Sequence, residues 1–239
     1  TMIEASHRIS IELLRTENHP CSYLPGRQAR SLVAVPAQMI DTTLYNAMIQ
    51  DGFRRSGGLV YRPDCDHCQA CQPVRLRVHD MAIDRSQRRA LKRHANLEAR
   101  ELPLLFHEEH YALYQRYQKT RHAGGGMDED DEEQYGRFLM QSQVDTRLIE
   151  FREKDQLRLV SVIDVLADGL SSVYTFFEPG IPNASFGTFN ILWQAANCRQ
   201  LGLSYLYLGY WIEESPKMAY KARFQPLEVL KDSHWQAFQ

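Results

Sequence analysis

The sequence predicts an α+β protein with two parts: a small cysteine-bearing N-terminal domain, residues 1–82, and a larger domain, residues 83–239. Two observations lead to this division. Four of the five cysteines fall in the first third of the chain, where the apolar runs are short and lie among Pro, Gly and Asp. The remainder carries longer helical and strand patterns. A chain of 239 residues accommodates two domains, since typical domains have roughly 100–200 residues.

The composition is that of a globular protein, with 44% hydrophobic and 24% charged residues. The sequence has no apolar run near the roughly 18 residues that span a bilayer, and residues 1–14 lack the apolar stretch of a signal peptide. We therefore expect a cytoplasmic protein without a membrane partner. The net charge of −2 does not by itself indicate a nucleic-acid binder.

The N-terminal part is typical of a small, loop-rich unit. Short apolar runs predict strands at residues 31–35, 58–61 and 74–78. One helix is expected near residues 42–51, and Pro and Gly between these segments predict turns.

The second part begins with a predicted helix over residues 84–100, capped by Asp84 or Ser86. Eight Lys or Arg against three acids give residues 71–100 an excess of five positive charges. Five basic residues recur at a spacing that places them on one helical face: Arg85, Arg88, Arg89, Lys92 and Arg93. Such a stripe suits the phosphate backbone of a nucleic acid; the alternative is a solvated surface helix.

Three helices and four strands are predicted beyond this helix: helices at 108–122, 132–141 and 188–201, and strands at 146–151, 157–166, 170–177 and 203–209. Residues 167–169 predict a hairpin turn between the second and third of these strands. Thr188 is expected to cap the last helix and Gly202 to end it.

The order of these elements is similar to that of a GNAT-type (acyl-CoA N-acyltransferase-like) sheet. Enzymes that use CoA hold its pyrophosphate on a Gly-rich turn before the central helix, but here that junction, residues 184–188, has one glycine. The glycines at 124–126 are not a phosphate loop either, because the acidic run 128–133 follows them, and we expect a flexible loop. An acyl donor other than CoA, and no organic cofactor, are therefore expected.

The cysteines form a separate pattern. Cys65, Cys68 and Cys71 make two overlapping Cys-x-x-Cys steps, and Cys21 would complete four thiolate ligands. Thiolates at this spacing bind zinc or an iron–sulfur cluster. A reducing cytosol disfavours disulfides, so the alternative is a set of reduced cysteines without metal.

Specific strings run in order through nearly the whole chain. They lie at residues 19–25, 52–57, 61–75, 86–89, 174–179, 205–210 and 216–226. In these strings the chain resembles the bacterial aspartate/glutamate leucyltransferases, relatives of the eukaryotic arginyl-tRNA–protein transferases. One departure is Ser215, which stands where relatives often have Cys and argues against a cysteine nucleophile there.

The resemblance implies a C-terminal GNAT-type domain and a specific reaction. Leucine would pass from leucyl-tRNA to the N-terminus of proteins beginning with Asp or Glu, which marks them for degradation by the N-end rule. The implied partners are charged tRNA and these acceptors, and DNA is not among them. The alternatives are the same chemistry with arginyl-tRNA, a CoA-dependent N-acetyltransferase, or a non-catalytic, metal-containing nucleic-acid binder built on residues 1–100.

For catalysis we expect Asp164, Tyr174 and Glu178. Strand alternation places Tyr174, Phe176 and Glu178 on one face. Asp164 lies in an otherwise apolar strand, so it needs a partner if it is buried. A structural hydrogen bond is the alternative role for Asp164.

An acidic acceptor needs cations that bind its carboxylate, and Arg offers two parallel donors. The candidates for substrate binding are Arg54, Arg55, Arg75, Lys217, Tyr220, Lys221 and Arg223. A leucyl group needs an apolar pocket, for which Phe176, Phe177 and Tyr207 are candidates, although aromatic residues in strands more often belong to the core.

Overall fold

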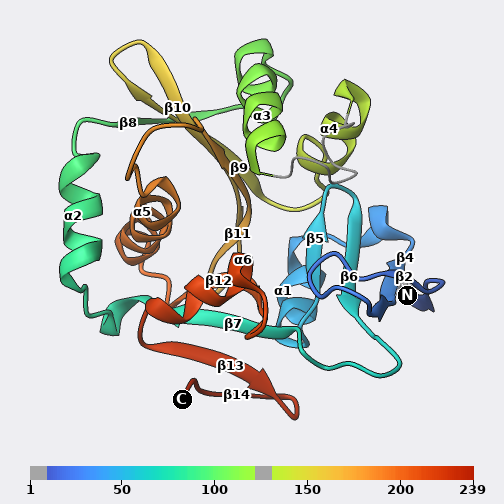
Figure 1. Ribbon diagram of the computed structural model, residues 1–239. Coiled ribbons are helices and arrows are strands. Elements are labelled where there is room, and N and C mark those ends of the chain that lie inside the picture. The colour runs from blue at the N-terminus through green and yellow to red at the C-terminus, as the bar shows by residue number, and fades with distance from the viewer. Residues whose placement is uncertain (1–9, 122–130) are drawn as a thin grey trace, which may run out of the picture.

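The structure is a computed structural model that describes residues 10–121 and 131–239 (Figure 1). The predicted glycine loop at 124–126, and the acidic run as far as residue 130, lie outside the described residues. The described residues form a mixed α+β protein with two larger sheets, one two-stranded sheet and covering helices. No helix of the described residues has the length and apolar character needed to cross a membrane.

The N-terminal part forms a four-stranded antiparallel sheet in the order β1-β4-β6-β5. Its strands are β1 (Glu12–Arg15), β4 (Ser31–Val35), β6 (Leu59–Pro63) and β5 (Arg54–Ser56), with a small β2 (His19–Pro20) and β3 (Gln28–Ala29) ladder beside them. Helix α1 (Thr42–Gln50) starts at Asp41, whose carboxylate accepts from the Leu44 amide at 2.9 Å. The core of this N-terminal part includes Leu166 and Tyr207 from the second part of the chain, so the two parts share buried side chains.

The second sheet has eight strands in the order β14-β13-β7-β12-β11-β10-β9-β8. Their bounds are β7 (Gln72–Arg77), β8 (Glu98–Leu102), β9 (Thr146–Glu153), β10 (Gln156–Val165), β11 (Gly169–Phe177), β12 (Tyr205–Trp211), β13 (Leu227–Lys231) and β14 (His234–Ala237). All neighbours are antiparallel except β11 and β12. Strand β7 precedes residue 82 in the chain, yet it lies between β12 and β13.

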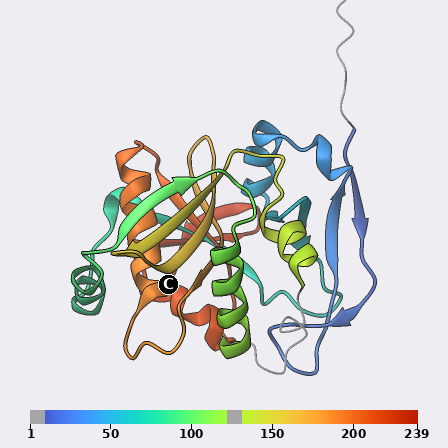
Figure 2. The same ribbon diagram turned by 90° about the horizontal axis from the view of Figure 1, so that it is seen from above.

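Helices cover both faces of this sheet (Figures 1 and 2). Helices α5 (Phe186–Gln200) and α2 (Arg85–Arg93) pack on one face, and α3 (Glu108–Arg121) and α4 (Glu132–Leu139) on the other. The short helices are η1 (Ala37–Met39), η2 (Val78–Asp80), α6 (Pro216–Ala219) and η4 (Tyr220–Arg223). Each face therefore has its own hydrophobic core.

The parallel strands β11 and β12 pair over only three residues. Gly169 to Ser171 face Tyr205 to Tyr207, and no pairing between these strands follows. A β-carbon at Gly169 would lie 2.2 Å from the carbonyl oxygen of Tyr205, so this close approach requires glycine. Beyond Ser171 the two strands separate, and the opening faces the start of α5.

Most predicted elements are confirmed within a few residues, including the turn at 167–169, the Asp84 cap of α2 and the ending of α5 at Gly202, which has φ +70°. Two predictions are wrong. The helix over 84–100 ends at Arg93, because the chain turns and residues 98–102 pair with β9 as strand β8. Thr188 does not cap α5, which starts at Phe186 after Ser185 in a left-handed conformation at φ 54°.

Candidate active site

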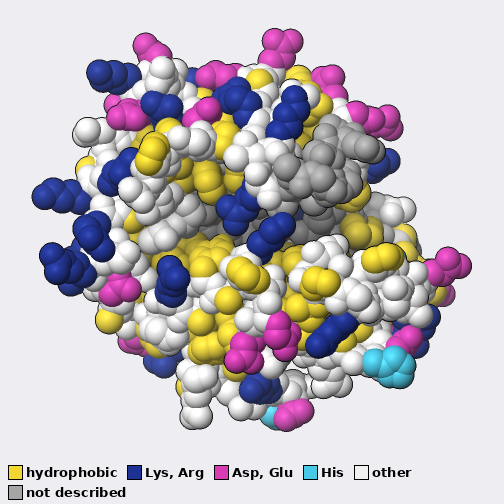
Figure 3. All heavy atoms as spheres, in the orientation of Figure 1, with side chains coloured by type: hydrophobic (Ala, Val, Ile, Leu, Met, Phe, Trp, Pro, Cys, Tyr) yellow, Lys and Arg dark blue, Asp and Glu magenta, His cyan; other side chains and the backbone are white. Residues whose placement is uncertain are grey.

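A cavity of about 750 Å³ lies where β11 and β12 separate. Its walls come from both strands, the start of α5, the end of α3, the segment 217–221 and the N-terminal sheet. In Figure 3 the face is hollowed near its centre, where Lys and Arg side chains gather. Among the described residues, five basic side chains line the cavity against a single carboxylate, that of Glu178: Arg54, Arg55, Arg121, Lys217 and Lys221.

Arg54 is a buried cation at one end of this cavity, only 5% exposed. It donates to the carbonyl oxygen of Phe53 at 2.8 Å and to that of Gly209 at 3.4 Å. Its Nε has no hydrogen-bond partner, and no carboxylate among the described residues forms an ion pair with it. The guanidinium lies 5.5 Å from the ring centre of Tyr210. This end of the cavity thus holds a positive charge that the described residues do not neutralise.

Lys221 lies beside Arg54 and is 8% exposed. Its Nζ donates to the carbonyl oxygen of Tyr210 at 2.7 Å and lies 3.2 Å from the sulfur of Met218. Burial, reinforced by the Arg54 guanidinium, lowers the pKa of the Lys221 side chain to about 7. Near neutral pH this group is therefore divided between ammonium and neutral amine.

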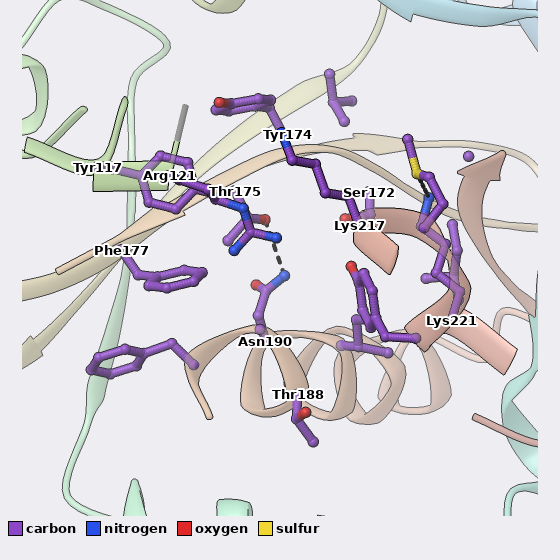
Figure 4. Close-up of a pocket in the computed structure, with 18 of the residues that line it drawn as sticks. Tyr117, Arg121, Ser172, Tyr174, Thr175, Phe177, Thr188, Asn190, Lys217 and Lys221 are labelled. Carbon is purple, nitrogen blue, oxygen red and sulfur yellow. Dashed lines mark hydrogen bonds between the residues drawn. The ribbon is translucent and has the colours of Figure 1, made fainter. Parts of the chain in front are cut away.

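Two further cations reach the cavity from opposite sides (Figure 4). Lys217, on α6, extends toward Tyr174. Arg121, at the end of α3, has its guanidinium carbon 5.6 Å from the ring centre of Tyr117 and 5.9 Å from that of Phe177. Within residues 10–121 and 131–239, no carboxylate forms an ion pair with Arg121.

The other end of the cavity is apolar except for Arg121, whose guanidinium lies against Tyr117 and Phe177. It is lined by Tyr117, Phe177, Ile181, Ala184 and Phe186. The rings of Phe177 and Phe186 lie 5.6 Å apart between their centres. The cavity therefore has a cationic end and an apolar end in one continuous space.

Two of the three predicted catalytic residues line the cavity. The Tyr174 hydroxyl accepts from Gln118 at 2.8 Å, and Glu178 forms an ion pair with Arg116 at 2.8 Å. Both partners lie on α3, so Tyr174 of β11 and Glu178, one residue past the end of that strand, contact the same helix.

Asp164 is not part of the cavity wall. Its carboxylate receives two hydrogen bonds from Arg55, at 2.9 and 2.7 Å, and one from the Thr146 hydroxyl at 2.6 Å. The Arg55 and Asp164 side chains are 1% and 0% exposed. The partner expected for a buried Asp164 is thus Arg55, and the pair joins β5 to β10.

Several other predicted residues also lie away from the cavity. Arg75 pairs with Glu228 at 2.7 Å and stacks on Tyr205 and Trp235, and Arg223 is exposed. Of the apolar candidates, Phe177 lines the cavity, whereas Phe176 and Tyr207 are core residues with 0% exposure. Tyr220 does line it, together with Arg54, Arg55, Lys217 and Lys221.

The cysteines do not form the predicted metal site. In the part of the chain that the structure describes, no group of three or more His, Cys, Asp or Glu side chains is placed to hold a metal ion. The Cys68 sulfur accepts instead from Arg27 at 3.4 Å, and the Cys21 sulfur from two backbone amides. Burial, with the thiols of Cys21, Cys65 and Cys68 nearby, raises the pKa of the Cys71 thiol to about 12. All four cysteines are free of disulfides, and we derive no reaction step from a metal.

The basic stripe of α2 is exposed, and Lys and Arg side chains gather at the left edge of Figure 3, where α2 lies. Gln87 and Ala90 face inward. At the end of the helix Arg93 donates to the carbonyl oxygen of Pro182 at 2.9 Å, and the His94 ring stacks on Phe186 at 4.5 Å. The stripe therefore ends against the loop that borders the apolar end of the cavity.

Arg121, Thr175 and Asn190 are among the cavity residues that sequence reasoning missed. A signal for Asn190 was present, because Asn190 and Gln194 are polar residues four apart in a mostly apolar helix. Buried amides at this spacing require hydrogen-bond partners.

Known proteins match both parts of the chain. The family described as "Arginine-tRNA-protein transferase, N terminus" matches residues 19–89, and "Arginine-tRNA-protein transferase, C terminus" matches residues 109–231. The chain belongs to the arginine-tRNA-protein transferase family. The resemblance drawn from the sequence strings is thereby confirmed.

Individual relatives in the arginine-tRNA-protein transferase family are similar over nearly the full length. The aspartate/glutamate leucyltransferase of Nitrosospira multiformis is 57% identical over 95% of this chain and 90% of that protein. That of Chromobacterium violaceum is 53% identical over 98% of this chain and 96% of that protein. The crystal structure of FemX overlaps 87% of this chain and 81% of that chain with a TM-score of 0.47 and 7% identity.

Proposed function

We propose that this protein transfers leucine from leucyl-tRNA to the N-terminus of proteins that begin with Asp or Glu, and so marks them for degradation in the cytoplasm. The observation that carries the proposal is the cavity with a cationic end and an apolar end. The cationic end suits the acidic side chain of the acceptor, and the apolar end suits the leucine side chain of the donor. The family membership and the names of the relatives support the same assignment.

Arg54 is the residue that we assign to the acceptor carboxylate. Its charge is buried, and the described residues offer it no carboxylate. A buried charge is costly unless it is paired, so the acidic side chain of the acceptor completes this site. Arg55, in contrast, is already paired with Asp164 and serves to support the wall.

Lys221 is the group that we assign to the acceptor amine. An N-terminal ammonium must lose a proton before it can attack, and its pKa is roughly 7.7–8.0. A neutral Lys221 that donates one N–H to Tyr210 retains a lone pair for that proton. The amine nitrogen then bonds to the ester carbonyl carbon, the bond from that carbon to the tRNA 3′ oxygen breaks, and the tRNA oxygen takes up a proton.

The pH dependence of transfer follows from this role. We expect kcat to rise about tenfold per pH unit up to about pH 7 and then to level off, because Lys221 must be neutral to act and its pKa lies at about 7. In Lys221→Met the rise should move to the range of the free amine, roughly pH 7.7–8.0. Steady-state rates at saturating substrates between pH 5.5 and 9 check this, and identical profiles for both proteins would exclude Lys221 as the base.

The leucyl group fits the apolar end formed by Phe177, Ile181 and Phe186. This end lies at the start of α5, beside the opening between β11 and β12. The opening between these two parallel strands gives the acyl donor a place beside the start of α5, and we assign the C-terminal part to the GNAT type. The single glycine before α5 continues to favour a donor other than CoA.

The tRNA itself is assigned to the exposed basic stripe of α2. The stripe ends next to the loop at Pro182, so a tRNA held along it presents its 3′ end to the cavity. Phosphate contacts of this kind give binding that weakens as salt is raised.

Charge removal on α2 tests this tRNA site. The double variant Arg89→Gln/Lys92→Gln should lower the slope of log affinity against log salt by about 0.7–0.9 for each phosphate that the helix no longer neutralises. Titration of leucyl-tRNA at several salt concentrations measures the slope. Lys231→Gln, which removes an exposed cation from β13, is the matched control and should leave the slope unchanged. Equal slopes in all three proteins would place tRNA elsewhere.

The decisive test of the function is a transfer assay with purified protein. Labelled leucine on tRNA should appear on peptides that begin with Asp or Glu and not on peptides that begin with Asn or Gln. Arginyl-tRNA is the second donor in the same assay. Transfer from arginyl-tRNA alone would correct the donor, and no transfer from either would overturn the proposal.

A further inference from the structure

We propose that the side chains of Thr175 and Asn190 donate hydrogen bonds to the carbonyl oxygen of the aminoacyl ester during transfer. The inference rests on the proposed function and adds two catalytic residues to it. Both side chains line the cavity, one from β11 and the other from α5 (Figure 4). Neither belongs to the cations or carboxylates already discussed.

A buried network holds the Asn190 amide in one orientation. Asn190 is 3% exposed, and its Oδ1 accepts from the Ser161 hydroxyl at 2.5 Å and from Gln194 Nε2 at 3.1 Å. Its Nδ2 donates to Thr175 Oγ1 at 3.0 Å. The four side chains thus connect the floor of the cavity to strand β10 and to the inner face of α5.

The Ser161 distance decides which end of the Asn190 amide faces the cavity. A separation of 2.5 Å fits an O–H donor and an oxygen acceptor, and it is too short for an N–H donor, whose range is roughly 2.7–3.2 Å. The amide oxygen is therefore directed at Ser161, and the nitrogen at Thr175. In this orientation Gln194 Oε1 is buried without a hydrogen-bond partner. The other hydrogen bonds of the network offset the cost of this unsatisfied oxygen.

Two protons are consequently available at the cavity floor. Asn190 Nδ2 carries two N–H groups, and the described residues accept only the one that points to Thr175. Thr175 Oγ1 accepts from Asn190, and its distance to Ser161 Oγ is long, at 3.4 Å. Since the Ser161 proton is used on Asn190, only Thr175 can donate in this contact. At 3.4 Å the contact is longer than the roughly 2.5–3.0 Å of an O–H···O hydrogen bond, so the Thr175 hydroxyl can turn its proton to an acceptor in the cavity.

Thr175 and Asn190 lie where the reacting carbonyl of the ester is expected, and not where the side chains of the two substrates bind. Thr175 is two residues from Phe177 and Asn190 is four from Phe186, the residues that form the apolar end. Arg121 lines the same cavity and adds positive potential to it. A leucyl side chain in the apolar end leaves its ester carbonyl near these donors. When the amine attacks, that oxygen becomes negatively charged, and donors fixed beforehand stabilise it.

The test uses paired substitutions of nearly equal shape in the full-length protein. Thr175→Val removes the hydroxyl, Thr175→Ser keeps it, and Asn190→Asp removes both N–H donors. Thr43→Val, at an exposed position of α1, is the matched control for the Thr to Val change. The measurements are kcat and the KM for an Asp-initiated peptide at saturating charged tRNA, with thermal melting to confirm folding.

We expect Thr175→Val and Asn190→Asp to lower kcat by about 100- to 1,000-fold, the usual effect of losing one such donor, with KM for the peptide within about twofold. Thr175→Ser should retain most of the rate. A loss that falls on KM for the peptide would mean that the pair binds the acceptor carboxylate, and unchanged rates in both folded variants would also overturn the inference. If Thr175→Val fails to fold, Asn190→Asp decides. If the wild type transfers leucine or arginine from no charged tRNA, the proposed function fails and the inference fails with it. If the wild type is active and both folded variants transfer at the wild-type rate, only the inference fails.

Discussion

Replacing Asp164 by Asn is expected to lower the free energy of unfolding by about 3–5 kcal/mol, the usual cost of removing one partner from a buried ion pair. Asn keeps the shape and loses the charge. The Arg55 guanidinium would then remain buried with only neutral partners, namely the substituted amide oxygen, the carbonyl oxygens of Gly57 and Gln141, and the Thr146 hydroxyl. Denaturant unfolding followed by fluorescence or circular dichroism measures the change.

The exposed pair of Arg77 and Asp80 supplies the control. These side chains are 49% and 53% exposed, so Asp80→Asn should cost no more than about 1 kcal/mol. If Asp164→Asn costs no more than this control, the buried pair does not stabilise the junction between β5 and β10. A variant that keeps full stability but loses transfer would restore the sequence-based prediction that Asp164 is catalytic.

Replacing Arg54 by Met is expected to reduce kcat/KM for peptides that begin with Asp or Glu by about 30- to 3,000-fold. Leaving a buried charge without its partner costs about 2–5 kcal/mol, and each 1.4 kcal/mol is about tenfold. In this variant the acceptor carboxylate enters a cavity that has lost its unpaired cation. Rates for peptides that begin with Asn or Gln should change little, so the preference for acidic acceptors should collapse.

Arg75→Met is the matched control, since Arg75 is also buried, at 7% exposure, but pairs with Glu228 outside the cavity. It should lower stability and leave the preference for acidic acceptors intact. Competition assays with Asp-, Asn- and Glu-initiated peptides separate the two effects. The same loss of preference in both variants would indicate general damage and refute the role of Arg54.

Local patterns predicted most helices and strands, but not where tertiary pairing overrides them. The segment Glu98–Leu102 consists of good helix formers, which extended the predicted helix beyond Arg93. Its pairing with β9 makes it a strand, and a distant strand cannot be identified from local spacing. The position of β7 inside the second sheet depends on strands far along the chain for the same reason.

Sequence patterns predicted which types of residue line the site, but not the role of each residue. Arg54, Lys217 and Lys221 were expected as cations, and all three line the cavity. That Arg55 is neutralised while Arg54 is not depends on which one lies beside Asp164, and adjacent residues give no such information. The lowered pKa of Lys221 likewise comes from burial and a neighbour that only the folded chain supplies.

The place of β7 has a consequence for how the protein is made. This strand leaves the ribosome long before its two neighbours, β12 and β13, which begin at Tyr205 and Leu227. Throughout that interval both of its edges carry unpaired N–H and C=O groups, the condition that promotes pairing with other chains. A nascent chain that stalls before residue 205 should therefore be prone to aggregation and dependent on chaperones, and the emergence of β12 and β13 should be the event that completes the sheet.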